Sequence, residues 1–90
     1  MLELSTADRH TVGKDIQKVE FGWPLGRPYC APLGSGLWDV RSTLERNRIA
    51  RVIFSMHDDQ MILLHGFIKK TEQIPQREIE LALKRRREIT

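Results

Sequence analysis

The residues of this sequence best suited to chemistry are basic side chains within and at the ends of the expected strands. Arg51 stands between two isoleucines on one face of a strand, where a guanidinium is costly unless it is paired or faces a groove. Arg41 lies in the preceding strand, and Lys69 and Lys70 end the following one, so that one lysine belongs to each face. In an antiparallel sheet, one face would therefore gather Arg41, Arg51 and one lysine into a cationic pocket.

Such a pocket suits phosphodiester chemistry without a metal. When an RNA 2′-hydroxyl attacks the adjacent phosphate, negative charge builds on the phosphoryl oxygens, and each preplaced guanidinium stabilises that transition state by roughly 3 kcal/mol. A lysine among other cations has a lowered pKa, which brings it closer to acting as an acid or a base at neutral pH. The alternative is structural: Arg51 pairs with Asp39 or Glu45, and the two lysines only protect a strand end.

Two other residues each have a functional and a structural interpretation. His65, beside Gly66 in mid-strand, is either a hydrogen-bonded core residue or the proton donor to a leaving 5′-oxygen. Trp23 lies in a segment rich in glycine and proline, where it either packs the loop or stacks on a base. The sequence has no metal-ligand spacing, nucleophile elbow, phosphate-binding glycine loop or dinucleotide motif, so we expect no metal and no cofactor.

Composition and charge narrow the classes of protein and partner. The chain has 90 residues, of which 40% are hydrophobic and 30% charged, and this predicts one globular domain over residues 1–90 with a small core. Residues 1–36 are neutral, whereas residues 37–90 carry eleven basic and eight acidic side chains and hence the whole net charge of +3. This excess favours a polyanion as partner, either nucleic acid or an acidic protein; the alternative is an ordinary, modestly basic surface.

The sequence also bears on location. No apolar run exceeds four residues, so no membrane helix is expected, and the first eight residues lack the pattern of a secretory signal. Cys30 is the single cysteine, which excludes an internal disulfide framework and fits the reducing cytoplasm.

Periodicity and turn signals predict the elements that position these residues. Ser5 as N-cap and an apolar stripe of Val12, Ile16 and Val19 predict a helix over residues 7–21. Residues 22–36 contain four glycines and three prolines, which predicts a long irregular connection with a short extended piece around residues 29–31.

Three strands are predicted next, over residues 37–44, 48–56 and 60–69, and the short turns between them imply an antiparallel meander. The third strand is apolar on both faces, which is typical of an internal strand. Pro75 opens a last helix that ends at the basic run 84–87. The order predicts an α+β fold, with a curved antiparallel sheet of about three strands and N-terminal and C-terminal helices packed on it.

Several segments resemble the phage-derived HigB-type branch of the RelE toxin superfamily. The most specific is Leu63–Thr71, which reads Leu-Leu-His-Gly-Phe-Ile-Lys-Lys-Thr. The supporting segments are Phe21–Gly26, Leu37–Arg41, Ile49–Phe54 and Glu78–Ala82. Together the matches run from about residue 5 to residue 87.

The resemblance implies the toxin of a type II toxin–antitoxin module. Such a toxin is a ribosome-dependent, metal-independent endoribonuclease that cuts mRNA in the ribosomal A site, and an antitoxin with a helix-turn-helix domain neutralises it. Carried over by motif, the catalytic residues are Arg51, Lys69, Lys70 and His65. The substrate-binding residues are Arg41, Arg48, Thr71 and Trp23. The basic run 84–87 either completes its helix or contacts ribosomal RNA.

One departure from the family leads to alternatives. Members usually begin with a strand and another helix before the helix that starts here at Ser5, and we expect this chain to lack both. A sheet edge would then be left unpaired, for a homodimer or an antitoxin to cover. One alternative function is a truncated, catalytically inactive homologue that only binds antitoxin or nucleic acid, and another is a simple basic RNA-binding module.

Overall fold

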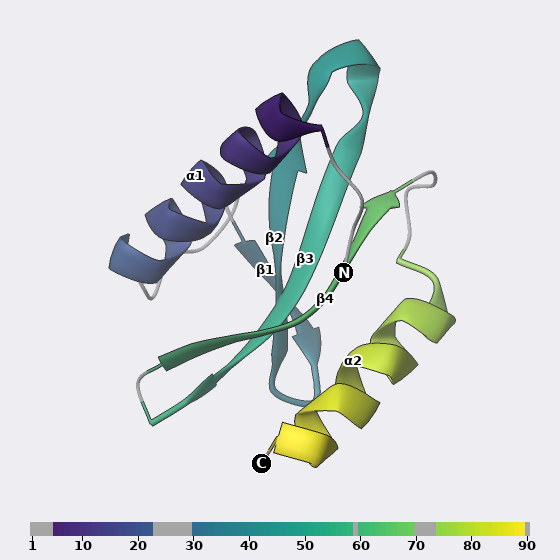
Figure 1. The fold of residues 1–90 in the computed structure, drawn as a ribbon. Helices are drawn as coiled ribbons and strands as arrows, with labels where there is room; N and C mark the ends of the chain where they lie inside the picture. The colour runs from purple at the N-terminus through teal and green to yellow at the C-terminus, as the bar shows by residue number, and fades with distance from the viewer. Residues whose placement is uncertain (1–4, 23–29, 59, 70–73, 90) are drawn as a thin grey trace.

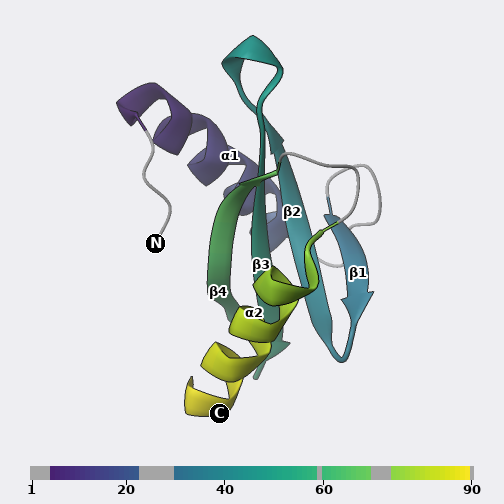
Figure 2. The same cartoon turned by 90° about the vertical axis from the view of Figure 1, so that its right-hand side faces the viewer.

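The computed structural model describes residues 5–22, 30–58, 60–69 and 74–89. Its elements in chain order are α1 (Thr6–Gly22), β1 (Cys30–Gly34), β2 (Leu37–Thr43), a 3₁₀ turn (Glu45–Asn47), β3 (Ile49–His57), β4 (Gln60–Lys69) and α2 (Gln76–Ile89). The strands form one antiparallel sheet in the order β1-β2-β3-β4. Helices α1 and α2 lie on opposite faces of this twisted sheet (Figures 1 and 2). The predicted α+β class is therefore confirmed.

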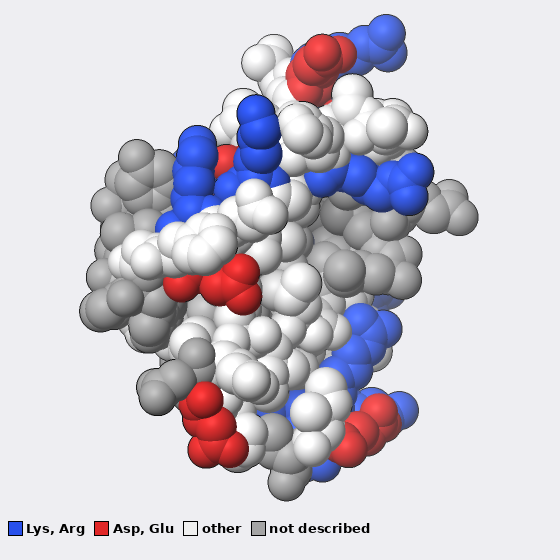
Figure 3. Space-filling model, turned by 60° about the vertical axis from the view of Figure 1, so that its left-hand side comes forward, with Lys and Arg blue, Asp and Glu red and all other residues white. Residues whose placement is uncertain are grey.

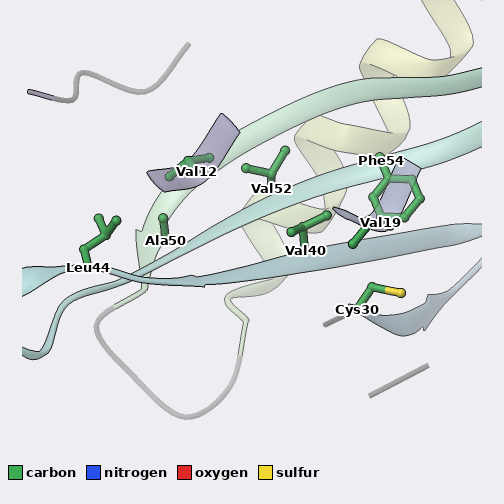
Figure 4. Close-up of a cluster of buried hydrophobic side chains, with 8 residues drawn as sticks. All are labelled: Val12, Val19, Cys30, Val40, Leu44, Ala50, Val52 and Phe54. Carbon is green, nitrogen blue, oxygen red and sulfur yellow. The ribbon is translucent and has the colours of Figure 1, made fainter. Parts of the chain in front are cut away.

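Helix α1 begins and packs as its sequence predicts. The Ser5 Oγ accepts a hydrogen bond of 3.1 Å from the backbone N–H of Asp8, which satisfies one of the free donors at the helix start. Val12 and Val19 are buried against the sheet, and Ile16 packs beside them. Figure 4 shows this core, formed by Val12, Val19, Cys30, Val40, Leu44, Ala50, Val52 and Phe54. The Ser42 hydroxyl also donates a bond of 2.6 Å to Asp15, so a polar contact ties α1 to β2.

Helix α2 covers part of the other face. Ala82 is fully buried there, and Ile79 and Leu83 pack with it. The strand residues beneath the helix are Leu37, Ile53 and Leu64. The apolar stripe predicted for the last helix is thus the side that contacts the sheet.

The structure corrects three details of the sequence prediction. Residues 30–34, expected to be mostly irregular, form a fourth strand that pairs with β2. Strand β4 lies at an edge of the sheet among the described residues, although its apolar character on both faces had indicated an internal strand. Finally, α2 continues to Ile89, so the basic run 84–87 lies within the helix.

Candidate functional site

The strand register brings Arg41 and Arg51 together on one face of the sheet. Arg41 of β2 pairs directly with Arg51 of β3, and Arg51 pairs with Phe67 of β4. Position 69 pairs with Ile49 in the next row of the same face. We call Arg41 and Arg51 the arginine pair; its two members lie on one face, as the strand alternation predicts.

The two arginines differ in exposure: Arg41 is exposed, whereas the side chain of Arg51 is only 14% exposed. Helix α2 packs on Leu37 and Ile53, toward the β1–β2 turn. In the register of β2 and β3, the arginine pair is the next row of the same face toward the β2–β3 turn. Figure 1 shows α2 beside the end of the sheet where β1 and β2 join. Arg41 and Thr43 on β2 are exposed, and no described helix covers them. Among the described residues, the guanidinium of Arg41 is therefore exposed on this face.

The two arginines differ in their partners. Arg51 Nη1 donates a hydrogen bond of 2.6 Å to Asp39 Oδ2, and the two side chains are 14% and 1% exposed. Asp39 Oδ1 and Arg51 Nε are buried without a partner among the described residues. Arg41 forms no ion pair within the described part of the chain. The structure thus adopts the ion pair with Asp39, one of the two structural pairings predicted for Arg51, while Arg41 keeps its charge available.

His65 is held from both sides by α2. Its Nε2 contacts the Glu78 carboxylate, and its Nδ1 lies 3.0 Å from Arg85 Nη1, which also donates a bond of 2.9 Å to the Leu64 carbonyl. The imidazole stacks on Phe67, with ring centroids 5.7 Å apart. Both ring nitrogens are therefore engaged, which favours the interpretation of His65 as a hydrogen-bonded core residue.

Sequence reasoning missed Glu78 and Arg85. They are seven residues apart, which is about two helical turns, so they share one side of α2. That spacing was a usable signal for a common partner. The sequence does not reveal which strand the helix would cross, so it gave no reason to choose His65.

Arg48 is not brought together with the arginine pair. It precedes β3 and forms an ion pair of 2.8 Å with Asp8 of α1, on the helix that covers the opposite face. Its Nε also donates a bond of 3.2 Å to the Glu45 carbonyl. These groups line a pocket of about 590 Å³, whose residues are Ser5, Ala7, Asp8, Glu45, Arg46 and Arg48.

The remaining predicted site residues lie outside the described part of the chain. They are Trp23, Lys70 and Thr71, together with the side chain of Lys69. For Lys69 the structure describes its strand position opposite Ile49.

The basic run 84–87 serves partly to hold α2 in place. Arg85 bonds to β4 as described, and Arg86 donates a hydrogen bond to the Ser35 carbonyl in the β1–β2 turn. Lys84 and Arg87 are exposed. On the face drawn in Figure 3, basic side chains occur in separate groups with acidic ones between them. The basic surface is therefore divided on that face.

Other chemistry finds little support in the described residues. Burial raises the pKa of the Cys30 thiol, and the negative charge of Asp39 raises it further. The thiol therefore stays protonated and unreactive. No group of three His, Cys, Asp or Glu side chains comes together among the described residues. No described helix is long and apolar enough to cross a membrane.

The comparisons with known proteins define the class to which the chain belongs. Residues 1–87 match the family described as phage derived protein Gp49-like (DUF891). The chain belongs to this family, which is part of the RelE/HigB-like group of toxins. A search among curated proteins finds no match.

Proposed function

We propose that this protein is the toxin of a type II toxin–antitoxin module, of the HigB type, and that it cleaves mRNA in the ribosomal A site. The proposed reaction is attack of an RNA 2′-hydroxyl on the adjacent phosphate, without a metal or cofactor. The observation that carries the proposal is the arginine pair on one face of the sheet, with Arg41 exposed, in a chain of a toxin-like family. The proposed partners are ribosome-bound mRNA, ribosomal RNA and a helix-turn-helix antitoxin in the cytoplasm.

The roles of the two arginines follow from their contacts. Arg41 is exposed, so it binds the substrate phosphate and stabilises the charge that develops on it. Arg51 is held by Asp39, which neutralises much of its charge but fixes the direction of its guanidinium. A preoriented donor costs no reorganisation when the transition state forms. Arg51 therefore contributes mainly through placement and Arg41 mainly through charge.

Proton transfer is assigned to the basic segment that follows the arginine pair. Position 69 belongs to the face of the arginine pair, which supports Lys69 as the group that exchanges protons with the 2′-hydroxyl or the leaving oxygen. Lys70 is the second candidate for this role, and Thr71 and Trp23 are proposed to contact the substrate. Both ring nitrogens of His65 contact side chains of α2, so we assign His65 no role in proton transfer to or from the RNA.

A second candidate function is a catalytically inactive homologue that binds antitoxin or nucleic acid. The observation that favours it is the engagement of two proposed catalytic side chains, Arg51 with Asp39 and His65 with Glu78 and Arg85. An inactive homologue would bind its antitoxin tightly but cause no growth arrest when expressed alone.

The proposal is tested by mRNA cleavage on programmed ribosomes with purified protein. Arg41→Ala removes an exposed charge without disturbing a described contact, and we expect cleavage to fall about 10²–10³-fold, as for loss of one transition-state donor. We expect Lys69→Ala to cause a loss of similar size.

The matched control is Arg9→Ala. Arg9 is an exposed arginine on α1, and α1 covers the opposite face of the sheet. This variant should cleave as fast as the unmodified protein. Equal rates for Arg41→Ala, Lys69→Ala and Arg9→Ala would refute the assigned roles, and the absence of cleavage by the unmodified protein would favour the inactive homologue.

A further inference from the structure

We infer that Glu78 and Arg85 of α2 are positioning residues, which fix the tautomer and ring plane of His65 and through it the wall of the proposed active site. The expected effect on catalysis rests on the proposed function. The tautomer of His65 can be measured whether or not the protein cleaves RNA. The three side chains belong to two elements, His65 to β4 and the other two to α2. We call them the histidine clamp.

The tautomer follows from the chemistry of arginine. A guanidinium donates hydrogen bonds and never accepts them at ordinary pH. Arg85 Nη1 lies 3.0 Å from His65 Nδ1, so Nδ1 presents its lone pair and the imidazole is neutral. The single ring proton is then on Nε2, which donates to the Glu78 carboxylate. The two α2 residues thus select one of the two neutral forms of the ring.

The clamp is sheltered enough for these contacts to matter. The side chains of His65 and Glu78 are each 13% exposed, so water competes weakly for their hydrogen bonds. Arg85 is also bonded to the Leu64 carbonyl, which fixes the guanidinium relative to β4. The imidazole therefore has one orientation in which all its polar atoms are satisfied.

Phe67 lies between the histidine clamp and the arginine pair. The held imidazole stacks on Phe67, with an interplanar angle of 23°. Phe67 pairs directly with Arg51 in the register of β3 and β4. A change in the His65 ring plane would therefore move the aromatic side chain that lies next to the arginine pair.

The tautomer is tested by ¹⁵N–¹H NMR of the imidazole at pH 7.5 in the full chain. We expect the unmodified protein to have a protonated Nε2 and an unprotonated Nδ1 at His65. In Arg85→Met, which keeps an apolar side chain of similar length but loses the donors, we expect the Nδ1 signal to shift and the two tautomers to mix. Arg9→Met, far from the clamp on α1, should leave the spectrum of His65 unchanged.

Two substitutions at Glu78 separate the acceptor from the charge. Glu78→Gln retains an oxygen that accepts from Nε2, so we expect it to preserve the tautomer. Glu78→Leu removes that acceptor while Arg85 still donates to Nδ1, so we expect the Nε2 signal to shift and the ring to keep its tautomer but lose its fixed orientation. A protonated Nδ1 in the unmodified protein, or a His65 spectrum that Arg85→Met leaves unchanged, would overturn the inference.

The catalytic arm uses the cleavage assay on programmed ribosomes. A displacement at the active site lowers the rate of the bound complex, so we expect Arg85→Met and Glu78→Leu to reduce the maximal cleavage rate about tenfold, with Glu78→Gln close to the unmodified protein. Unchanged maximal rates in Arg85→Met and Glu78→Leu would overturn the positioning role. If the unmodified protein does not cleave, the proposed function fails while the NMR result still decides the tautomer.

Discussion

At the scale of the residue, the buried ion pair between Asp39 and Arg51 holds one of the two arginines of the candidate site in place. Strand alternation placed Arg41 and Arg51 on one face, because side chains alternate with a period of two. Strand alternation alone did not decide whether Arg51 pairs with Asp39 or with Glu45. The choice depends on hairpin geometry: Glu45 lies in the 3₁₀ turn, whereas Asp39 lies within β2 on the face of Arg51.

Breaking this ion pair from one side should strongly destabilise the protein. Arg51→Met leaves the carboxylate of Asp39, which is 1% exposed, without its cation. We expect a loss of about 3–5 kcal/mol in the free energy of unfolding, measured by urea denaturation. The double variant Asp39→Val/Arg51→Met removes both charges and should recover most of that loss.

The control for this cycle is Arg9→Met, which removes an exposed arginine and should change the free energy of unfolding by less than about 0.5 kcal/mol. A double variant as unstable as Arg51→Met alone would mean that packing, and not an uncompensated charge, sets the cost.

At the scale of the element, the long and periodic segments were predictable and the two sheet edges were not. The apolar stripes of α1 and α2 each identified the side that contacts the sheet. Strand β1 has only five residues and contains Pro32, so composition favoured an irregular segment. Strand β4 is apolar on both faces because helices pack on each side of the sheet, and that pattern carries no information about the number of neighbouring strands.

Two glycines make a sharp test of the local backbone. Gly36, in the β1–β2 turn, has a φ of +77°, and a Cβ there would lie 3.1 Å from Arg86 Nη1. We expect Gly36→Ala to lower the free energy of unfolding by about 1–2 kcal/mol, because an L side chain is strained at this φ.

The same substitution at Gly13 should have the opposite sign. Gly13 lies in the middle of α1, and a Cβ there would meet nothing within 4 Å. Gly13→Ala should raise the free energy of unfolding by about 0.5–1 kcal/mol, since alanine is the better helix former. Urea denaturation measures both variants, and the same sign for the two would contradict the backbone assignment.

At the scale of the whole molecule, each helix packs on a different face of the sheet. Helix α1 and one face form a core, while α2 covers only part of the other face (Figures 1 and 2). The exposed Arg41 lies outside the part that α2 covers, and the histidine clamp links α2 to β4 within the covered part. The spacing of the basic residues predicted which face of the sheet carries Arg41 and Arg51. The sequence does not reveal which part of that face α2 covers.

The most direct measurement uses ribosomes programmed with mRNA that carries a single 2′-deoxynucleotide on the 5′ side of the cleaved bond. We expect the unmodified protein to cut the all-RNA message in the A site, to leave a cyclic phosphate, and to fail to cut the deoxy-substituted message at that bond. Equal cleavage of both messages would contradict attack by the 2′-hydroxyl. No cleavage of either would contradict ribonuclease activity altogether.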